Sequence, residues 1–434
     1  MPKRNAADAR SGVSDSRSTP VDRPLLVVPR RWLATLTVVT VLPWLIAAGF
    51  YSRGPSGTGA PETSRDAAPG DPALAASDDP RPWGQLIVTP IVISPPLEYV
   101  PSNWGPVEPP RWYFHRTTRP QLEQLLTSAG LSAQQTAQLL TSLRLDGQDL
   151  VVEPDPKLVR GLDRHVRATL YGVLAQSPRN HRQRDAYRHF GASGEAWLGL
   201  APISHRTRQL VEPLIYSVGD FVYFADIDLV RPDITDPSEL QRLAKRLLRE
   251  GTMLVRLRLD QSQLDAAVEY WGRGGRRTDI RPLLESVVSS GQDRTIDISH
   301  LLPTLAREHL YRYPRVALGD FDKPSLVNCF WTALNFFNAE PDDRYLSSEF
   351  AIESLKRDYF IIHDQLQLGD VVAFVDPAGG IFHAAVYLAD GLVFGKNGTS
   401  HLSPWSIVPM DRLKGYYLEH ADHWQVVYYR RNGT

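Results

Sequence analysis

Apolar and polar residues alternate differently in three parts of the chain. Residues 32 to 50 form an uncharged apolar run, which as a helix is long enough to cross a bilayer core of about 30 Å. The segments before and after it lack apolar periodicity. We therefore expect a disordered cytoplasmic tail over residues 1–30, a transmembrane anchor over 31–51 and a flexible linker over 52–82. Residues 83–434 show the periodicities of folded domains.

Basic residues flank the apolar run unequally. Seven precede it, whereas Arg53 stands nearly alone after it; the seven are Lys3, Arg4, Arg10, Arg17, Arg23, Arg30 and Arg31. The positive-inside rule then keeps the N-terminus cytoplasmic and places the bulk of the chain outside the membrane. For a bacterial protein this predicts a single-pass inner-membrane protein facing the periplasm. Ala47-Ala48-Gly49 leaves cleavage of the segment as an alternative.

Residues 83–315 combine helical and strand periodicities and predict a mixed, mainly helical domain, to which no chemistry can be attached. Two short helices are expected around Gly130, the first capped by Thr117 or Thr118 and the second by Ser132. Further helices are expected over 156–176, 204–216, 237–250, 261–271, 280–289 and 300–311. Strands are expected over 221–229 and 253–259.

Two local patterns in this region could suggest a binding site. Asp220, Asp226 and Asp228 cluster around the 221–229 strand, but solvated turn acids are a simpler interpretation than metal ligands. The loop 272–277 reads Gly-Arg-Gly-Gly-Arg-Arg. Without a preceding phosphate-loop pattern, we interpret it as a solvated turn.

Residues 316–434 predict one helix followed by an antiparallel meander. After Ser325, apolar residues recur at helical spacing from Leu326 to Phe337. Strands then follow over 367–375, 382–388, up to about Asn397, and 424–429, with a turn at Asp390-Gly391. The whole chain is therefore expected to be α+β.

Cys329 is the only cysteine among 434 residues, so it cannot close an internal disulfide. It falls in the first turn of the predicted helix, whether Ser325 or Asn328 is the cap, where backbone N–H groups favour a thiolate. Nucleophilic catalysis explains an unpaired thiol in an exported protein, and a buried small hydrophobe is the alternative.

The base expected to act with this thiol is His383. A two-residue turn at Asp390-Gly391 would put Lys396 on the same sheet face as His383, and a three-residue turn would put Asn397 there. Asn397 is favoured as the residue that orients the imidazole, because an amide oxygen accepts from its N–H and an ammonium group does not. His401 is a further alternative.

Composition narrows the classes of function that the chain can have. The net charge is −1, with no basic patch of the kind that nucleic acid requires. Metal-ligand spacings such as Cys-x-x-Cys are absent from the sequence, so we expect neither a metal nor a cofactor. No pattern sets an oligomeric state.

Residues 325–400 resemble the NlpC/P60 cysteine peptidases in three features. These are a cysteine at a helix start, a Gly369-Asp370 strand entry, and His383 followed by small residues, an aliphatic residue and Tyr387. Phe330-Trp331 replaces the usual Ser-Gly, and Gly395 stands where a third histidine is common. The resemblance implies a papain-like core of one helix packed on an antiparallel sheet. It also implies Cys329 as nucleophile, His383 as base and a third polar residue near Asn397.

We therefore expect a membrane-anchored envelope thiol hydrolase that cleaves amide bonds, with peptidoglycan stem peptide as the implied substrate. Two alternatives stay open. One is a non-catalytic envelope binding or structural protein on a peptidase fold, and the other is an amidase or acyltransferase acting on protein or lipid.

Overall fold

The structure is a computed structural model that describes residues 81–100, 105–191, 193–199, 203–290, 295–315, 327–418 and 424–433. The predicted tail and anchor, and nearly all of the predicted linker, lie outside these residues. Within them, no helix combines the length and apolar character needed to cross a bilayer. The described residues all belong to one compact unit.

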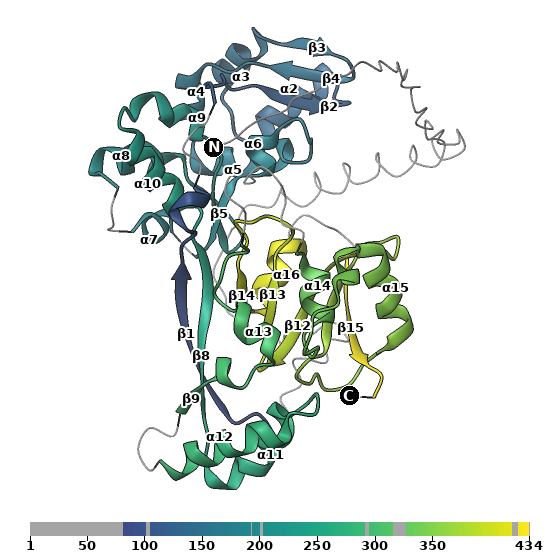
Figure 1. The fold of residues 1–434 in the computed structure, drawn as a ribbon. Helices are drawn as coiled ribbons and strands as arrows, with labels where there is room; N and C mark the ends of the chain where they lie inside the picture. Colours follow the sequence, from purple (N-terminus) through teal and green to yellow (C-terminus); the bar gives the residue numbers. More distant parts are fainter. Residues whose placement is uncertain are drawn as a thin grey trace, which may run out of the picture. The chain divides into compact units, whose positions relative to one another are not determined.

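A long strand, β1 (Gln85–Ile93), precedes a region of short elements over residues 105–249 (Figure 1). These elements are β2 (Trp112–His115), α2 (Arg119–Ser128), α3 (Ala133–Leu140), β3 (Arg144–Asp146), β4 (Asp149–Val152), α4 (Pro156–Arg160), α5 (Arg164–Leu174), α6 (His181–Arg184), β5 (Tyr187–Phe190), α7 (Gly194–Leu198), α8 (His205–Val211), β6 (Tyr216–Val218), β7 (Phe221–Phe224), α9 (Ile227–Val230) and α10 (Pro237–Leu247).

The rest of the chain alternates helices with longer strands. First come β8 (Glu250–Arg258), α11 (Leu264–Trp271), α12 (Arg277–Ser289), β9 (Thr295–Asp297) and α13 (Thr304–His309). The C-terminal part contains α14 (Cys329–Leu334), α15 (Ser348–Asp358), β10 (Tyr359–Ile361), β11 (Val371–Val375), β12 (Ile381–Ala389), β13 (Leu392–Lys396), β14 (Trp405–Pro409), α16 (Met410–Leu418) and β15 (Gln425–Arg431).

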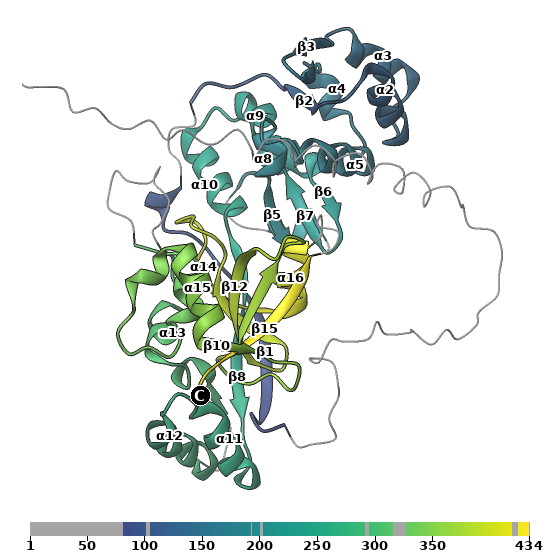
Figure 2. The same cartoon turned by 90° about the vertical axis from the view of Figure 1, so that its right-hand side faces the viewer.

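Antiparallel sheets organise these elements, which confirms the α+β class. Six strands of the C-terminal part pair in the order β10-β15-β11-β12-β13-β14. Three smaller sheets have the orders β1-β8-β9, β2-β4-β3 and β5-β7-β6. Strands β1 and β8 pair along their full length, from Gln85 opposite Arg258 to Ile93 opposite Glu250 (Figures 1 and 2).

Local sequence signals locate several helix ends correctly. Thr118 and Ser132 each form a capping box at the start of α2 and α3, as predicted. The predicted helix over 156–176 is wrong as one element, because it is divided into α4 and α5. Asp163 caps α5 by accepting from the backbone N–H of His165 at 2.7 Å. The 221–229 strand likewise ends at Phe224 and is followed by α9.

The main apolar core runs across the predicted domain boundary at residue 316. It joins Trp83 and residues of β8, α11 and α12 to α14 and to one face of the six-stranded sheet. A second cluster covers the other face of that sheet and includes Phe374, Ala385 and Leu413. Residues 105–249 contain two further clusters. Strand β12 is therefore enclosed on both faces.

Asp226 corrects our interpretation of the aspartate cluster. It is buried, and its carboxylate accepts hydrogen bonds from Arg167 and, at 2.6 Å, from the hydroxyl of Tyr171. Arg167 is fully buried and also donates to the carbonyl of Val159 at 2.7 Å. Burial raises the pKa of Asp226, and the attraction to Arg167 opposes that rise. This carboxylate is a structural ion-pair partner and not a solvated turn acid.

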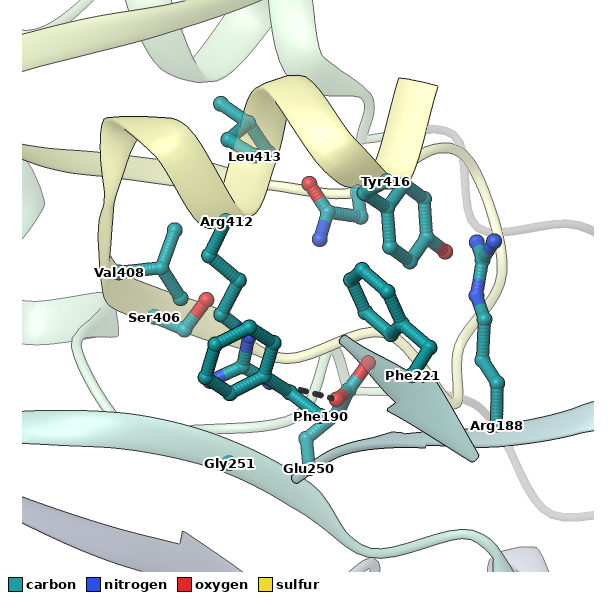
Figure 3. Close-up of a pocket in the computed structure, with 11 residues that line it drawn as sticks. Arg188, Phe190, Phe221, Glu250, Gly251, Ser406, Val408, Arg412, Leu413 and Tyr416 are labelled. Carbon is teal, nitrogen blue, oxygen red and sulfur yellow. Dashed lines mark ion pairs between the residues drawn. The ribbon is translucent and has the colours of Figure 1, made fainter. Parts of the chain in front are cut away.

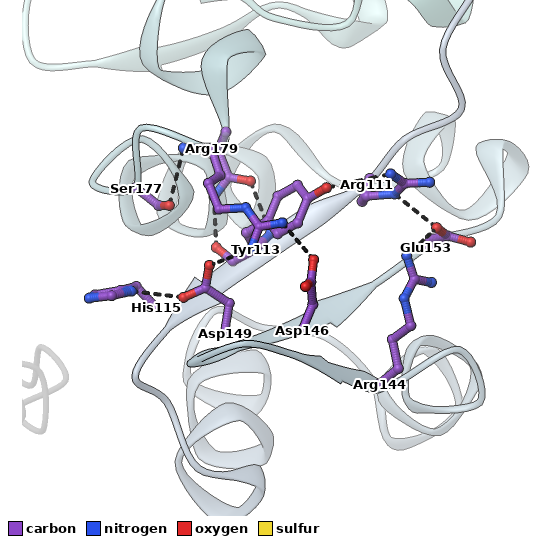
Figure 4. A network of polar contacts seen from close by, with 10 residues as sticks. Arg111, Tyr113, His115, Arg144, Asp146, Asp149, Glu153, Ser177 and Arg179 are labelled. Atoms are coloured by element: carbon purple, nitrogen blue, oxygen red, sulfur yellow. Dashed lines mark hydrogen bonds and ion pairs between the residues drawn. The ribbon is translucent and has the colours of Figure 1, made fainter.

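A second polar network ties the α5–α6 connection to the β2-β4-β3 sheet (Figure 4). The guanidinium of Arg179 lies over the ring of Tyr113 at 3.9 Å and donates to Asp146 at 2.6 Å and Asp149 at 2.9 Å. Burial alone would raise the pKa of Asp149, but hydrogen bonds with His115 and Arg179 lower it overall. The network satisfies a carboxylate that the sheet would otherwise bury unpaired.

Arg167→Leu should destabilise the protein by about 3–5 kcal/mol, because it leaves the Asp226 carboxylate buried without its partner. Urea unfolding measures the loss. Arg344→Leu is the matched control, since Arg344 pairs with Asp342 while 72% exposed and should cost less than about 1 kcal/mol. Similar losses in the two variants would contradict the role of the buried pair.

Candidate active site

Cys329 is the first residue of α14. The side chain of Asn328 caps this helix by accepting from the backbone N–H of Trp331 at 2.9 Å, and it donates to the carbonyl of Leu346 at 3.1 Å. Of the two caps that the sequence left open, the structure uses Asn328. The thiol is 5% exposed and belongs to the main apolar core.

Two opposing effects act on the thiol. Burial raises the pKa of Cys329, and this effect is the larger one. Hydrogen bonding to the backbone N–H groups of Ala384 and Phe330, together with the positive charge of Lys396, lowers the pKa and offsets part of the rise. The sulfur therefore lies where an anion could be stabilised, but in a site too dry to favour ionisation in this arrangement.

His383 lies on β12, opposite Phe374 of β11. Its side chain is 1% exposed, and its ring stacks on Tyr417 of α16 at 4.1 Å between centroids. The Nε2 atom is buried and has no hydrogen-bond partner among the described residues. Burial lowers the pKa of His383 to about 3, so the imidazole is neutral at pH 7.

The thiol and the imidazole lie on opposite faces of β12, and no direct hydrogen bond joins them among the described residues. Cys329 packs on the α14 face, whereas the ring of His383 contacts Phe374 and Tyr417 on the other face. Ala384 follows His383 in the sequence and packs in the core cluster of α14. Hydrogen bonding by its backbone N–H lowers the pKa of the thiol. The negative charge of the Cys329 thiolate also raises the pKa of Tyr417, after the larger effect of burial. Tyr417 therefore contacts His383 directly and is close enough to Cys329 for the thiolate charge to affect its pKa.

A bulge in β12 determines which residue of β13 lies beside Ala385, and so tests the prediction for the third catalytic residue. The Asp390-Gly391 turn forms as expected, with Ala389 opposite Leu392, but the register shifts between Tyr387 and Ala389. As a result Gly395 lies beside Ala385: a Cβ on that glycine would be 3.4 Å from the Ala385 side chain. Neither Lys396 nor Asn397 therefore pairs with Ala385, contrary to both predicted registers.

Lys396 instead places its positive charge near the thiol, where it lowers the pKa of Cys329. It is fully buried, and its Nζ donates to the carbonyls of Gly398 at 2.7 Å and Ser400 at 2.9 Å. Burial lowers the pKa of Lys396 to about 8, while the Cys329 thiolate opposes that shift. No sequence pattern indicated this role, because a single bulged residue in β12 decides which side chains lie near the thiol.

Asn397 and His401 lie elsewhere. Asn397 lines a small cavity with Ser406, Glu250 and Arg412. The ring of His401 packs edge-on against Tyr99, with centroids 5.6 Å apart. Neither residue has a described contact with His383, so the structure does not assemble the predicted triad in this arrangement.

Helix α16 covers the imidazole. Besides stacking on His383, Tyr417 contacts Phe374 at 5.4 Å and Phe382 at 6.0 Å between ring centroids. Because the ring of Tyr417 fills the space against His383, substrate cannot reach the imidazole from this side while α16 stays in place. Nothing in the apolar pattern of residues 410–418 predicted this helix.

Charged side chains from the β5-β7-β6 sheet and β8 hold α16 in place (Figure 3). The guanidinium of Arg188 lies 3.1 Å from the centroid of the Tyr416 ring. Arg412 of α16 lies over the ring of Phe190 at 4.7 Å and approaches Glu250 at 4.0 Å. Burial lowers the pKa of both arginines and raises that of Glu250. The cavity they enclose has about 20 Å³, room for one water molecule.

Comparisons with known proteins identify no relative: no protein-family model, no curated protein and no solved structure matches this chain. Among the described residues, no group of three or more histidine, cysteine, aspartate or glutamate side chains could hold a metal ion. The functional assignment therefore depends on the residues themselves.

Tyr417→Ala should increase the rate at which iodoacetamide alkylates Cys329 in the folded protein by about tenfold or more, because it removes the ring that closes the site. Mass spectrometry of the modified peptide gives the rate. Phe360→Ala is the control, since Phe360 is 48% exposed on the edge strand β10 and should react like wild type. Unchanged labelling of the Tyr417 variant would contradict closure by α16.

Acidification should destabilise the protein partly through His383. Its pKa is 6.5 when unfolded and about 3 when folded, so below pH 6.5 the unfolded chain binds the additional proton. The stability contributed by the neutral imidazole is thus complete above pH 6.5 and is lost as the pH falls towards 3.

His383→Phe should remove this loss, since phenylalanine does not titrate. Between pH 7 and about pH 4.5, urea unfolding should show wild type losing on the order of 2 kcal/mol more stability than the variant. His363→Phe, at an exposed position, should keep the wild-type pH dependence. Parallel curves for wild type and His383→Phe would show that His383 is not buried in neutral form.

Proposed function

We propose that this chain is a cell-envelope thiol hydrolase that cleaves amide bonds, with peptidoglycan stem peptides as the substrate class, and that α16 keeps its site closed. The observation that carries the proposal is the position of Cys329. Hydrogen bonding from backbone N–H groups of α14 and of Ala384, the residue after His383, lowers the pKa of its thiol against the larger rise caused by burial. A lone cysteine buried only for packing does not need these donors.

The proposed reaction follows from this position. In the proposed open state, α16 withdraws Tyr417 and the imidazole turns past the strand to reach the sulfur. The proton of Cys329 then passes to His383, and the sulfur bonds to the amide carbonyl carbon. The carbon–nitrogen bond then breaks as the leaving amine takes the proton from His383. Water hydrolyses the thioester to a carboxylate and restores the thiol.

The N–H groups that face the sulfur support the charged stages of this reaction. The donors from α14 and Ala384 can stabilise negative charge on the thiolate or on a nearby oxyanion. The ammonium group of Lys396 adds a fixed positive charge. We further propose that the apolar segment over 31–51 anchors the protein in the inner membrane, with the bulk of the chain in the periplasm.

A non-catalytic envelope protein is the second candidate, and one observation favours it. The thiol and the imidazole are both nearly inaccessible, and burial shifts each pKa away from the value that catalysis requires: upward for Cys329 and downward for His383. An acyltransferase or amidase acting on protein or lipid would use the same residues as the hydrolase and differ in the acceptor.

Incubation of the Tyr417→Ala protein with purified stem-peptide fragments tests the proposal. Mass spectrometry should detect products that together carry the added mass of one water, and Cys329→Ser should reduce the rate by at least about 10³-fold, because hydroxyl is a poor substitute for thiolate here. His383→Gln should also lower the rate strongly. If the open form labels readily at Cys329 yet cleaves no amide, the binding role is the better assignment.

A further inference from the structure

A second candidate site lies in a groove between the α11–α12 connection and the C-terminal part of the chain. The groove has a volume of about 1100 Å³. It is lined by residues 272–275 of the connection, by the first two residues of α12, by Phe337, by 365–367 and by 431–433. Its walls are held together by Tyr270, whose buried hydroxyl donates to the carbonyl of Leu388 at 2.6 Å. This volume is slightly larger than the usual range for small-molecule sites and suits a short peptide.

Glycines shape the loop wall of the groove. A Cβ on Gly272 would lie 2.4 Å from the carbonyl oxygen of Val268, and one on Gly274 would lie 2.5 Å from the Phe337 ring. Gly275 has a φ of +80° and nothing within 4 Å of the Cβ position, so it faces open space. The close approach at two positions and the left-handed conformation at the third explain why this loop requires glycine.

The loop also presents donors without acceptors. Among the described residues, nothing accepts from the backbone N–H groups of Gly274 and Gly275. Arg276 fixes the loop from behind by donating to the carbonyls of Trp271 at 2.7 Å and Leu301 at 2.8 Å. Consecutive N–H groups held in a rigid loop favour an anion.

Arg273 is a charged residue of the groove without an ion-pair partner among the described residues. It is half-buried, its Nε is buried without an acceptor, and its guanidinium forms no ion pair within the described part of the chain. Two carboxylates act on it electrostatically, Asp370 and Glu269. Asp370 is already held by two hydrogen bonds from Arg430 at 2.9 and 2.8 Å, and Glu269 is paired with Arg277. A guanidinium kept in this state is suited to a carboxylate from outside the chain.

The other charged groups of the groove are already paired or add positive charge. Arg277 pairs with Glu269, the one acidic residue of the lining, and Arg431 donates to the amide of Asn338 at 3.1 Å. Among the described residues, the lining therefore contains three arginines and a single carboxylate. This balance favours an acidic ligand over a basic or neutral one.

We propose that this groove binds an acidic peptide, with a carboxylate of the peptide held by the guanidinium of Arg273 and by the N–H groups of Gly274 and Gly275. The side-chain amides of Gln365 and Gln367 lie along the same groove and can pair with the main chain of such a peptide. The site is separate from Cys329 and does not depend on the proposed hydrolase activity.

Fluorescence anisotropy of the full-length protein in detergent tests this site with two labelled probes, hexaglutamate and hexaglutamine. Wild type should bind hexaglutamate at least tenfold more tightly than hexaglutamine. Arg273→Gln should lose at least tenfold in affinity for hexaglutamate, and Arg273→Lys should fall between the two because it keeps the charge without the planar fork.

Arg281→Gln is the matched control. Arg281 lies on α12, is 46% exposed and pairs with Asp265, and it does not line the groove. The affinity of the Arg281→Gln protein for hexaglutamate should therefore stay within about twofold of wild type. Equal affinity of wild type for both probes would overturn the proposal, as would equal losses in Arg273→Gln and Arg281→Gln. Thermal melting of each variant verifies that the fold is intact.

Discussion

The enclosure of β12 between two apolar layers is the constraint on which the candidate active site depends. On one face, Ala384 and Val386 pack with α14, and on the other, Ala385 and Tyr387 pack beneath α16. Because consecutive side chains of a strand point to opposite faces, residues on both faces are removed from water. The same enclosure raises the pKa of the thiol and lowers that of the imidazole.

A layer of partly buried charge connects this strand to the rest of the chain. Helix α16 reaches β12 through Tyr417 and reaches the β5-β7-β6 sheet through Tyr416, which contacts Arg188. Glu250, at the start of β8, faces Arg412 on the same helix. Polar contacts of this kind are weaker and more sensitive to hydration than an apolar core. Helix α16 is also held by Met410 and Leu413 in the apolar cluster on this face of the sheet, so opening the site has to break both kinds of contact.

The candidate groove differs from the active site in its physical character. The thiol lies in a dry, apolar environment, whereas the groove is open, rich in backbone donors and lined by arginines. Each of the two sites is formed by segments that are far apart in the sequence. Tyr270 and Leu388, for example, are 118 residues apart and share a buried hydrogen bond. The main apolar core, which joins residues of β8, α11 and α12 to α14 and the C-terminal sheet, makes such sites possible in a chain with little local signal.

The sequence by itself determined the elements whose signals are local. The Thr118 and Ser132 caps, the Asp390-Gly391 turn and the helix start at Cys329 all follow from hydrogen bonds between residues close in the chain. The antiparallel C-terminal sheet followed from side-chain alternation. Only the tertiary structure decided that Lys396 acts on the thiol, that Tyr417 covers His383 and that Asp226 is buried with Arg167. These depend on a bulge and on packing between distant segments, and no local pattern of residues encodes either.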